Sequence, residues 1–446
     1  MRPIPMLIAG VVACAAALAG ETIVIRNADV YPVTAPVMKG VAVVIQDGKI
    51  AEIGAKVVPP KGARIVEAKG LRVYPGLIDS GTELGLSEVS STRETVDTGE
   101  LGEFMPQLRA LSAVNPESEH FGVVRVNGIT SAMTFPSSGG GGGGRFGGGE
   151  RQFISGQAAL IHTDGWTWED MAIERTAAVH LIFPSLGGRG GRGGPIPDSI
   201  LEVAPGAAAA AGFSAAKRQY DQQLAKVNEF FDQARQYQKE RAANAPGFKR
   251  DLKLDAMIPV LEGKVPVAVS ASRASVIRDA IAFADKQHIR IVILQPHDIS
   301  KIAPDLKAKN IPVVFGRVLA LPDQEDDPYD SAFTAPAEAY KAGVKLAFGT
   351  FSNEFVRNLP YQAATAVAFG LPYQEALKAI TINPAQIWGH GNDLGSVETG
   401  KFADLLVTDG DPLEIQTQVK HVFIKGKEVP LVNKQTRLEE KYMSRQ

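Results

Sequence analysis

The sequence predicts an α/β protein, a (β/α)8 TIM barrel joined to a small β-sandwich domain that is built from both ends of the chain. Three observations lead to this architecture. From residue 76 onward, short apolar runs typical of strands alternate with helical stretches, and β-type sequence stands both before and after that region. We therefore expect a small β domain from residues 20–75 and 391–435 and a barrel from residues 76–390.

Residues 1–19 have the pattern of a cleavable export signal. Arg2 precedes a stretch without charged side chains, which ends in a small-x-small pattern over residues 17–19. This stretch is shorter than the run that spans a bilayer, so we expect a periplasmic or extracellular protein that starts at Gly20. A lipoprotein anchored through Cys14 is the alternative, because residues 11–14 also resemble a short lipobox. Cys14 is the only cysteine, so the exported chain would have neither disulfides nor thiolate metal sites.

The overall charge excludes one class of partner. The chain has 446 residues, of which 22% are charged, and its formal net charge is −2. A protein with this balance has no strongly basic field to attract nucleic acid. We therefore expect no nucleic-acid partner, and no later segment is long and apolar enough for a membrane span.

The small β domain is predicted from alternating and apolar runs near both ends of the chain. Asp47 and Gly48 supply the residues of a tight hairpin turn between two of these runs. The expected strands are residues 22–25, 41–46, 49–53, 64–67, 71–74, 403–408 and 419–424.

The barrel is predicted from eight apolar β-type runs, which we interpret as parallel strands. These runs are residues 77–79, 130–135, 158–162, 178–183, 265–270, 290–294, 311–315 and 344–348. Helical candidates between them include residues 275–287, 300–309 and 336–342.

Three insertions interrupt the barrel pattern. Residues 139–149 and 187–194 are rich in glycine and are expected to form mobile loops. Residues 214–243 predict an inserted amphipathic helix with an apolar stripe that includes Phe230 and Phe231. This stripe either packs on the chain's own barrel or pairs subunits.

Three motifs carry a resemblance to a known family. They are VYPGLID at residues 73–79, AITINPA at residues 379–385, and LGSVETGKFADLLV at residues 394–407 followed by DGDP. With the export signal, they make the chain similar to the exported, imidazolonepropionase-like branch of the amidohydrolase superfamily. The order of the motifs agrees with a barrel that lies between two parts of a β domain.

The resemblance implies a divalent metal site, usually for zinc, at the strand carboxyl ends. Family members place His-x-His after strand one, single histidines after strands five and six, and an aspartate after strand eight. The metal ionises a water that attacks an amide or cyclic C–N bond. In this chain the corresponding positions hold Gly81, Glu83, Ser270, Gln295 and Phe351.

None of these five residues is the family's ligand. Glycine and phenylalanine cannot bind a metal, and the neutral oxygens of Ser270 and Gln295 are poor substitutes for imidazole on Zn²⁺. Only Glu83 offers a strong ligand. The family pattern therefore predicts a divalent metal, but the sequence lacks the residues to hold it.

Other residues could rebuild a site. Glu83, His297 and Asp298 together could hold one metal near the barrel mouth and are the candidate catalytic residues. Alternatively, His297 and Asp298 start the next helix, with Asp298 as its N-terminal acidic residue. One of His162 and His180 could also point at the mouth, although a histidine in the core is the simpler interpretation.

Two further segments could each have a binding function or be ordinary surface loops. The acidic run at residues 323–330 either binds a hard cation such as Ca²⁺ or faces solvent. The arginine–glycine loop at residues 187–194 resembles nucleic-acid-binding RGG segments, but a flexible lid fits an exported protein with only two arginines in the loop better.

Two functions follow from the sequence. In the first, the chain is a hydrolase acting on non-peptide C–N bonds, weakened or inactivated by the loss of its ligands. In the second, it is a pseudoenzyme that serves as a binding or partner subunit of an active amidohydrolase. A small-molecule ligand and a homo- or hetero-oligomer are expected with either.

Overall fold

The computed structural model describes residues 21–137, 152–185, 207–244, 246–322 and 327–445. The predicted export signal, both glycine-rich insertions and part of the acidic run lie outside these ranges. None of the helices in the described part of the chain combines the length and apolarity needed to cross a membrane.

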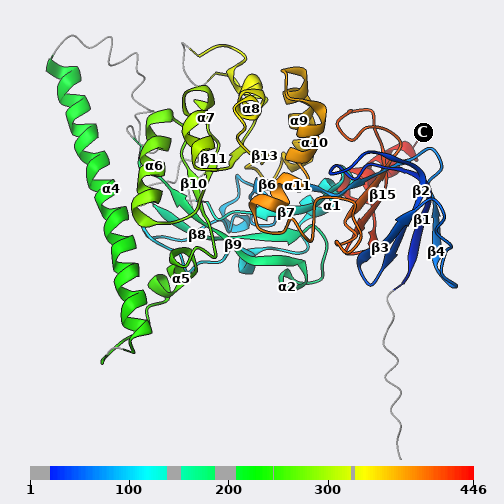
Figure 1. The fold of residues 1–446 in the computed structure, drawn as a ribbon, viewed down its shortest axis with the longest axis horizontal. Helices are drawn as coiled ribbons and strands as arrows, with labels where there is room; N and C mark the ends of the chain where they lie inside the picture. Colours follow the sequence, from blue (N-terminus) through cyan, green and yellow to red (C-terminus); the bar gives the residue numbers. More distant parts are fainter. Residues whose placement is uncertain (1–20, 138–151, 186–206, 245, 323–326, 446) are drawn as a thin grey trace, which may run out of the picture.

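An eight-stranded sheet forms a nearly closed barrel, and its strands follow one another in chain order from β6 to β13 (Figure 1). Each predicted strand falls on one of them, and the predicted α/β barrel class is confirmed. The strands are β6 (Leu77–Thr82), β7 (Ile129–Thr134), β8 (Ile154–His162), β9 (Ala172–Ile182), β10 (Val267–Ser270), β11 (Ile291–Leu294), β12 (Val313–Phe315) and β13 (Leu346–Phe348).

The prediction that all eight strands are parallel is wrong for the third one. β8 pairs antiparallel with β7 and with β9, whereas the other neighbouring pairs from β6 to β13 are parallel. Only residues 163–171 separate His162 from Ala172, and a parallel crossover needs about a dozen residues or more. The reversal places the first residues of β8, not its last, at the carboxyl ends of the parallel strands.

The barrel interior is apolar, and every strand contributes to it. One buried cluster contains Ile78, Met133, Leu160, Ala178, Ala268, Val292, Val314 and Ala347, one from each strand in turn. Such a layer is a packed core and not a pore. Chemistry is therefore confined to the rim of the barrel.

Helices cover the outside of the sheet (Figure 1). The predicted helices at residues 275–287, 300–309 and 336–342 correspond to α6, α7 and α8. The helices are α1 (Glu119–Arg125), α2 (Trp168–Met171), α4 (Ala207–Ala242), α5 (Leu252–Leu261), α6 (Ala274–Gln287), α7 (Ile299–Ala308), α8 (Ser331–Lys341), α9 (Leu359–Ala368), α10 (Tyr373–Ala379), α11 (Ile382–Ile387) and α12 (Lys434–Met443).

A second sheet unites the two ends of the chain, as the sequence predicts. Its order is β16-β15-β14-β5-β1-β2-β3, with β4 on β1, and the antiparallel pairing of β14 with β5 joins the late strands to the early ones. Asp47 and Gly48 both have positive φ, 50° and 79°, as the hairpin turn requires. The strands are β1 (Ile23–Val30), β2 (Met38–Gln46), β3 (Lys49–Gly54), β4 (Arg64–Glu67), β5 (Arg72–Pro75), β14 (Leu405–Thr408), β15 (Val419–Ile424) and β16 (Lys427–Val429).

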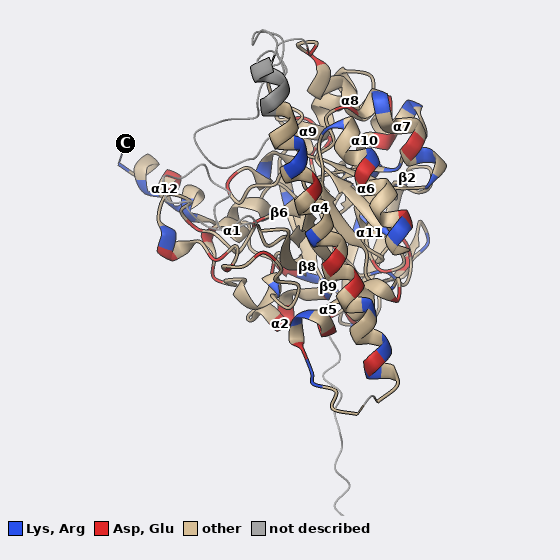
Figure 2. Cartoon of the chain, turned by 90° about the vertical axis from the view of Figure 1, so that its left-hand side faces the viewer, with Lys and Arg blue, Asp and Glu red and all other residues tan. Residues whose placement is uncertain are grey.

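The inserted helix α4 packs on its own chain through the apolar stripe. Phe231 is fully buried, and its ring meets Phe283 of α6 edge-on at 5.0 Å. Phe230 is 8% exposed and stacks on Phe104 at 4.5 Å. Lysines, arginines and acidic residues lie along the outer face of α4 (Figure 2). Phe230 and Phe231 are therefore core residues and are not available to pair subunits.

Candidate functional site

The structure brings the five family-pattern positions to one end of the barrel. Gly81 is the second-last residue of β6, Ser270 ends β10, and Gln295 directly follows β11. Glu83 directly follows β6, and Phe351 lies three residues beyond the last residue of β13. The carboxyl ends of barrel strands are where active sites of this fold lie, so this mouth is the candidate site.

The ring of Phe351 fills the space beside Gly81. A Cβ atom on Gly81 would lie 2.7 Å from Cζ and 2.8 Å from Cε1 of that ring. The backbone fixes this arrangement, because the Phe351 N–H donates to the Gly81 carbonyl at 2.7 Å and Phe351 has φ 46°. A histidine at position 81 cannot fit while the phenyl ring occupies this place.

Further aromatic side chains continue the apolar surface from Phe351. The ring of Phe135, at the end of β7, lies 6.4 Å from Phe351 and 5.9 Å from Trp388. The Trp388 indole N–H donates to the Ser80 hydroxyl at 2.7 Å. Apolar surroundings of this kind raise the cost of placing an unpaired dication there.

A buried carboxyl group closes the barrel beneath the aromatic rings. Asp79 on β6 accepts hydrogen bonds from the backbone N–H groups of Gly81 and Thr350 at 3.0 and 3.1 Å, and from the Thr350 hydroxyl at 2.6 Å. Burial raises the pKa of Asp79 to about 7, although the three hydrogen bonds oppose that rise. Because Thr350 follows β13, Asp79 holds the first strand of the barrel to the last.

Glu83 is the only member of the family pattern that could ligate a metal strongly. Burial raises the pKa of Glu83, and a hydrogen bond with the Ser137 side chain offsets part of the rise. Glu83 therefore lies against the Ser137 side chain, just beyond β7, and its burial disfavours the charged carboxylate that a metal ligand requires.

The carboxylate of Asp298 binds the start of α6 and not Glu83. Its carboxylate accepts the Ala274 N–H at 2.9 Å, at the first residue of α6, and lies 3.5 Å from Arg273. Although burial alone would raise it, the pKa of Asp298 is lowered by this hydrogen bond and by the charges of Arg273 and Lys301. The backbone N–H of His297 donates to the Ser272 carbonyl at 2.9 Å. Asp298 thus binds the start of α6 while it also precedes α7.

The residues present do not fit the zinc ions that the family pattern implies. Among the residues that the structure describes, no group of three histidine, cysteine or acidic side chains could hold a metal. Glu83, His297 and Asp298 therefore do not form a three-ligand set. The phenyl ring beside Gly81 and the neutral oxygens of Ser270 and Gln295 agree with this, because none of them replaces an imidazole.

The two histidines in the strands lie at opposite ends of the barrel. His162 ends the reversed strand β8, is buried, and has its Nδ1 3.3 Å from the Asp404 carboxylate. His180 in β9 points to the mouth, where its Nε2 lies 2.8 Å from the Ser270 hydroxyl. The sequence therefore identified His180 as a possible mouth residue, but gave no sign that its partner would be Ser270.

Ser155 joins this group because β8 is reversed. Its hydroxyl lies 2.8 Å from His180 Nδ1 and donates to the Pro136 carbonyl at 2.9 Å. Burial lowers the pKa of His180 to about 4, so the imidazole is neutral near pH 7. Ser155 was not predicted from the sequence as a mouth residue, since a parallel third strand would have placed it at the other end of the barrel.

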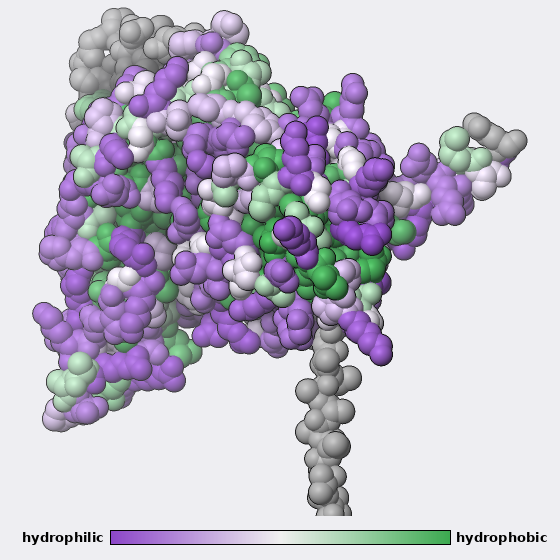
Figure 3. Space-filling view, turned by 45° about the vertical axis from the view of Figure 1, so that its right-hand side comes forward, coloured by the Kyte–Doolittle hydropathy of each residue, from purple (hydrophilic) through white to green (hydrophobic). Residues whose placement is uncertain are grey.

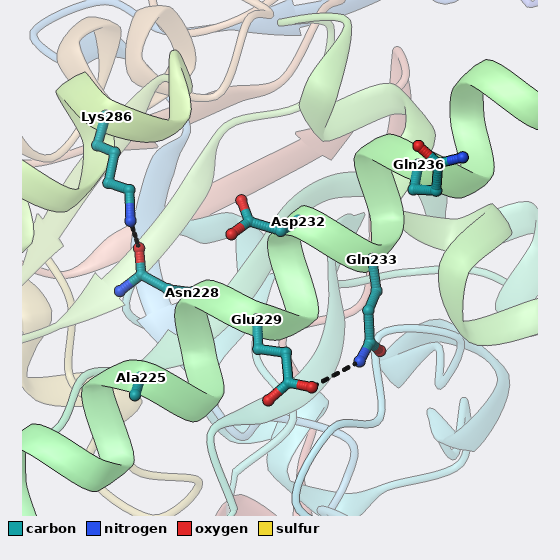
Figure 4. Close-up of a pocket in the computed structure, with 7 residues that line it drawn as sticks. All are labelled: Ala225, Asn228, Glu229, Asp232, Gln233, Gln236 and Lys286. Atoms are coloured by element: carbon teal, nitrogen blue, oxygen red, sulfur yellow. Dashed lines mark hydrogen bonds between the residues drawn. The ribbon is translucent and has the colours of Figure 1, made fainter.

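A groove of about 680 Å³ lies far from the mouth, along α4 (Figure 4). Its polar side chains are already hydrogen-bonded, either to one another or, for Asp232 and Gln236, to neighbouring side chains. The Lys286 ammonium donates to the Asn228 side chain at 2.9 Å, and the Gln233 amide donates to Glu229 at 3.2 Å. The groove therefore has no converging free polar groups and is not the candidate site.

Comparison with known proteins places the fold in one superfamily. The model of the amidohydrolase family matches residues 268–429. The chain is 24% identical to amidohydrolase tasK of Hapsidospora irregularis over 423 residues, which is 86% of this chain and 39% of that protein. It is 40% identical to an imidazolonepropionase of Syntrophobacter fumaroxidans over 81 residues, 17% of this chain and 19% of the relative. The matches thus span less than half the length of either relative.

A solved structure agrees over nearly the whole chain. The amidohydrolase from Thermotoga maritima MSB8 superposes with a TM-score of 0.75 at 26% identity, covering 92% of this chain and 99% of that one. The chain belongs to the amidohydrolase superfamily.

Proposed function

We propose that this chain has lost the metal-dependent hydrolysis of its superfamily and serves as a partner subunit of an amidohydrolase with intact metal ligands. The observation that carries the proposal is the contact of Phe351 with Gly81, where a side chain on residue 81 would lie 2.7 Å from the ring. An aromatic ring in the ligand space removes both the metal and the water that it would activate.

The loops around the mouth offer a surface for such a partner. Exposed apolar side chains follow β6, β12 and β13. The face drawn in Figure 3 also has apolar areas between hydrophilic side chains. Protein contacts commonly use apolar side chains that gather into a patch. These side chains are Val89, Leu101, Leu319, Leu321 and Phe355.

In the relative tasK, the region that matches this chain lies within a longer polypeptide. Its match with this chain covers 39% of that protein, so the shared region is one part of a longer polypeptide there. A separate chain of the same type could meet its partner through a surface contact.

The proposal is tested with the purified chain, alone and mixed with a superfamily relative from the same host that retains His-x-His. Alone, the chain should show no zinc-dependent hydrolysis of N-formyl amines or cyclic amides. The mixture should form a stable complex by light scattering, and replacing Leu319 and Leu321 with glutamate should weaken it. A zinc-dependent rate that disappears in Glu83→Ala would instead support a weak hydrolase with a site at Glu83.

A further inference from the structure

Ser270, His180 and Ser155 form a continuous hydrogen-bonded group on three strands at the barrel mouth. The Ser270 hydroxyl lies 2.8 Å from His180 Nε2, and the other ring nitrogen lies 2.8 Å from Ser155 and 2.9 Å from the Pro136 carbonyl. We propose that Ser270 and His180 are a nucleophile–base pair that transfers acyl groups from small apolar esters without a metal. The inference goes beyond the proposed function, which concerns the lost metal-dependent reaction and the role of a partner subunit.

The hydrogen-bond partners determine the tautomer of His180. A carbonyl oxygen can only accept, so the 2.9 Å contact with Pro136 requires a hydrogen on Nδ1. Because the imidazole is neutral, Nε2 then carries a lone pair and must accept the Ser270 hydroxyl proton. This is the arrangement of a general base beside a nucleophile, with a third group that orients the base.

The strands hold the pair rigidly. Ser270 pairs with Ile182 in the ladder between β10 and β9, and His180 pairs with Ala268 two residues earlier. Ser155 and His180 are buried, whereas Ser270 is partly exposed at the end of its strand. A nucleophile that reaches solvent while its base is shielded and fixed by sheet pairing is suited to attack on a bound carbonyl group.

The reaction balances with the groups present and water. The Ser270 Oγ forms a bond to the ester carbonyl carbon while its proton passes to His180 Nε2. The alkoxide leaves as the C–O bond breaks and takes that proton as the alcohol. Water then attacks the acyl-serine, giving its proton to His180, and the proton returns to Ser270 as the carboxylic acid departs. The Pro136 carbonyl and the Ser155 oxygen stabilise the transient imidazolium through Nδ1–H.

The surroundings define the class of substrate. The Phe135 ring meets the His180 ring edge-on at 5.5 Å, and Phe135 is itself next to Trp388 and Phe351. An apolar wall of this kind binds a small apolar acyl or aryl group and disfavours a charged one.

A fluorophosphonate probe tests the pair on the full-length protein in EDTA. The probe phosphonylates an activated serine as fluoride leaves, and the adduct is located by peptide mass spectrometry. We expect a single adduct on Ser270, none in Ser270→Ala, and labelling slower by about 100-fold or more in His180→Gln, which removes the base. Ser272→Ala, a change two residues away on the same loop, should label at the native rate. Thermal unfolding of each variant shows that the loss of labelling does not come from loss of folding.

An unlabelled native protein, or labelling of a serine other than Ser270, would overturn the inference. Equal labelling rates for the native protein and folded His180→Gln would also overturn it. Such a result would mean that His180 does not activate Ser270 and that the serine is only a hydrogen-bond partner of a buried histidine. These outcomes are independent of the proposed function, which fails on zinc-dependent hydrolysis or on the absence of a complex.

Discussion

Replacing Gly81 with alanine is expected to lower the free energy of unfolding by about 1–3 kcal/mol, the range for forcing extra methyl groups into a packed core. The new Cβ would lie 2.7 Å from the Phe351 ring, so the ring or the backbone must move. The φ of Gly81 is not in the positive range that favours glycine, so alanine costs little there apart from the contact. The change in the urea midpoint measures the effect.

A double-mutant cycle isolates the contribution of the ring. In a Phe351→Ala background, the same Gly81→Ala change should lower the free energy of unfolding by at least roughly 1 kcal/mol less than it does in the native background. Residues in contact couple by about that amount. Gly54→Ala is the matched control, because its nearest contact would be an ordinary 3.5 Å to Val57. Equal costs for Gly81→Ala in both backgrounds would show that Phe351 does not occupy the ligand space.

Removing the Asp79 carboxyl is expected to destabilise the barrel by about 3 kcal/mol or more, because each buried donor left without an acceptor costs roughly 1–3 kcal/mol. Asp79→Ala leaves three such donors, the N–H groups of Gly81 and Thr350 and the Thr350 hydroxyl. Asp79→Asn keeps one acceptor oxygen and should cost less. Similar urea midpoints for Asp79→Ala and the native protein would refute a role in closing the barrel.

The same carboxyl predicts a pH dependence of stability. Burial raises the folded-state pKa of Asp79 to about 7, whereas an unfolded aspartate releases its proton near pH ~4. The contribution of Asp79 to stability is therefore fully present below about pH 4 and is lost as pH rises toward about 7. Asp79→Asn should lack this decline. Urea unfolding of both proteins from pH 4 to pH 8 checks the difference, and parallel curves would contradict it.

The architecture was accessible from sequence because it rests on local patterns. Each apolar run became one strand of the barrel, and the β-type sequence at both ends became one sheet. The direction of β8 could not be predicted from the apolar run itself, since an apolar strand has the same pattern in either direction. The short connection before Ala172 was the missed signal, because it cannot carry a crossover.

The site was accessible only in part. The predicted strand ends, compared with the family's ligand pattern, located Gly81, Ser270 and Phe351 at the mouth, where the structure has them, since strand ends are fixed by the barrel. Their contacts were not accessible, because the Phe351–Gly81 and Ser270–His180 contacts join residues far apart in sequence. The inserted helix is a similar case. Its periodicity predicted the apolar stripe that contains Phe231, but it could not predict that Phe283 would pack against Phe231.

The most direct test of the lost metal site is the zinc content of the protein. Full-length protein is incubated with zinc, dialysed without chelator and measured by elemental analysis, beside a superfamily relative with intact ligands treated identically. With Phe351 in the ligand space and no three suitable side chains together among the described residues, we predict well under one zinc per chain while the relative retains its full complement. One tightly held zinc per chain, released by Glu83→Ala, would contradict the account.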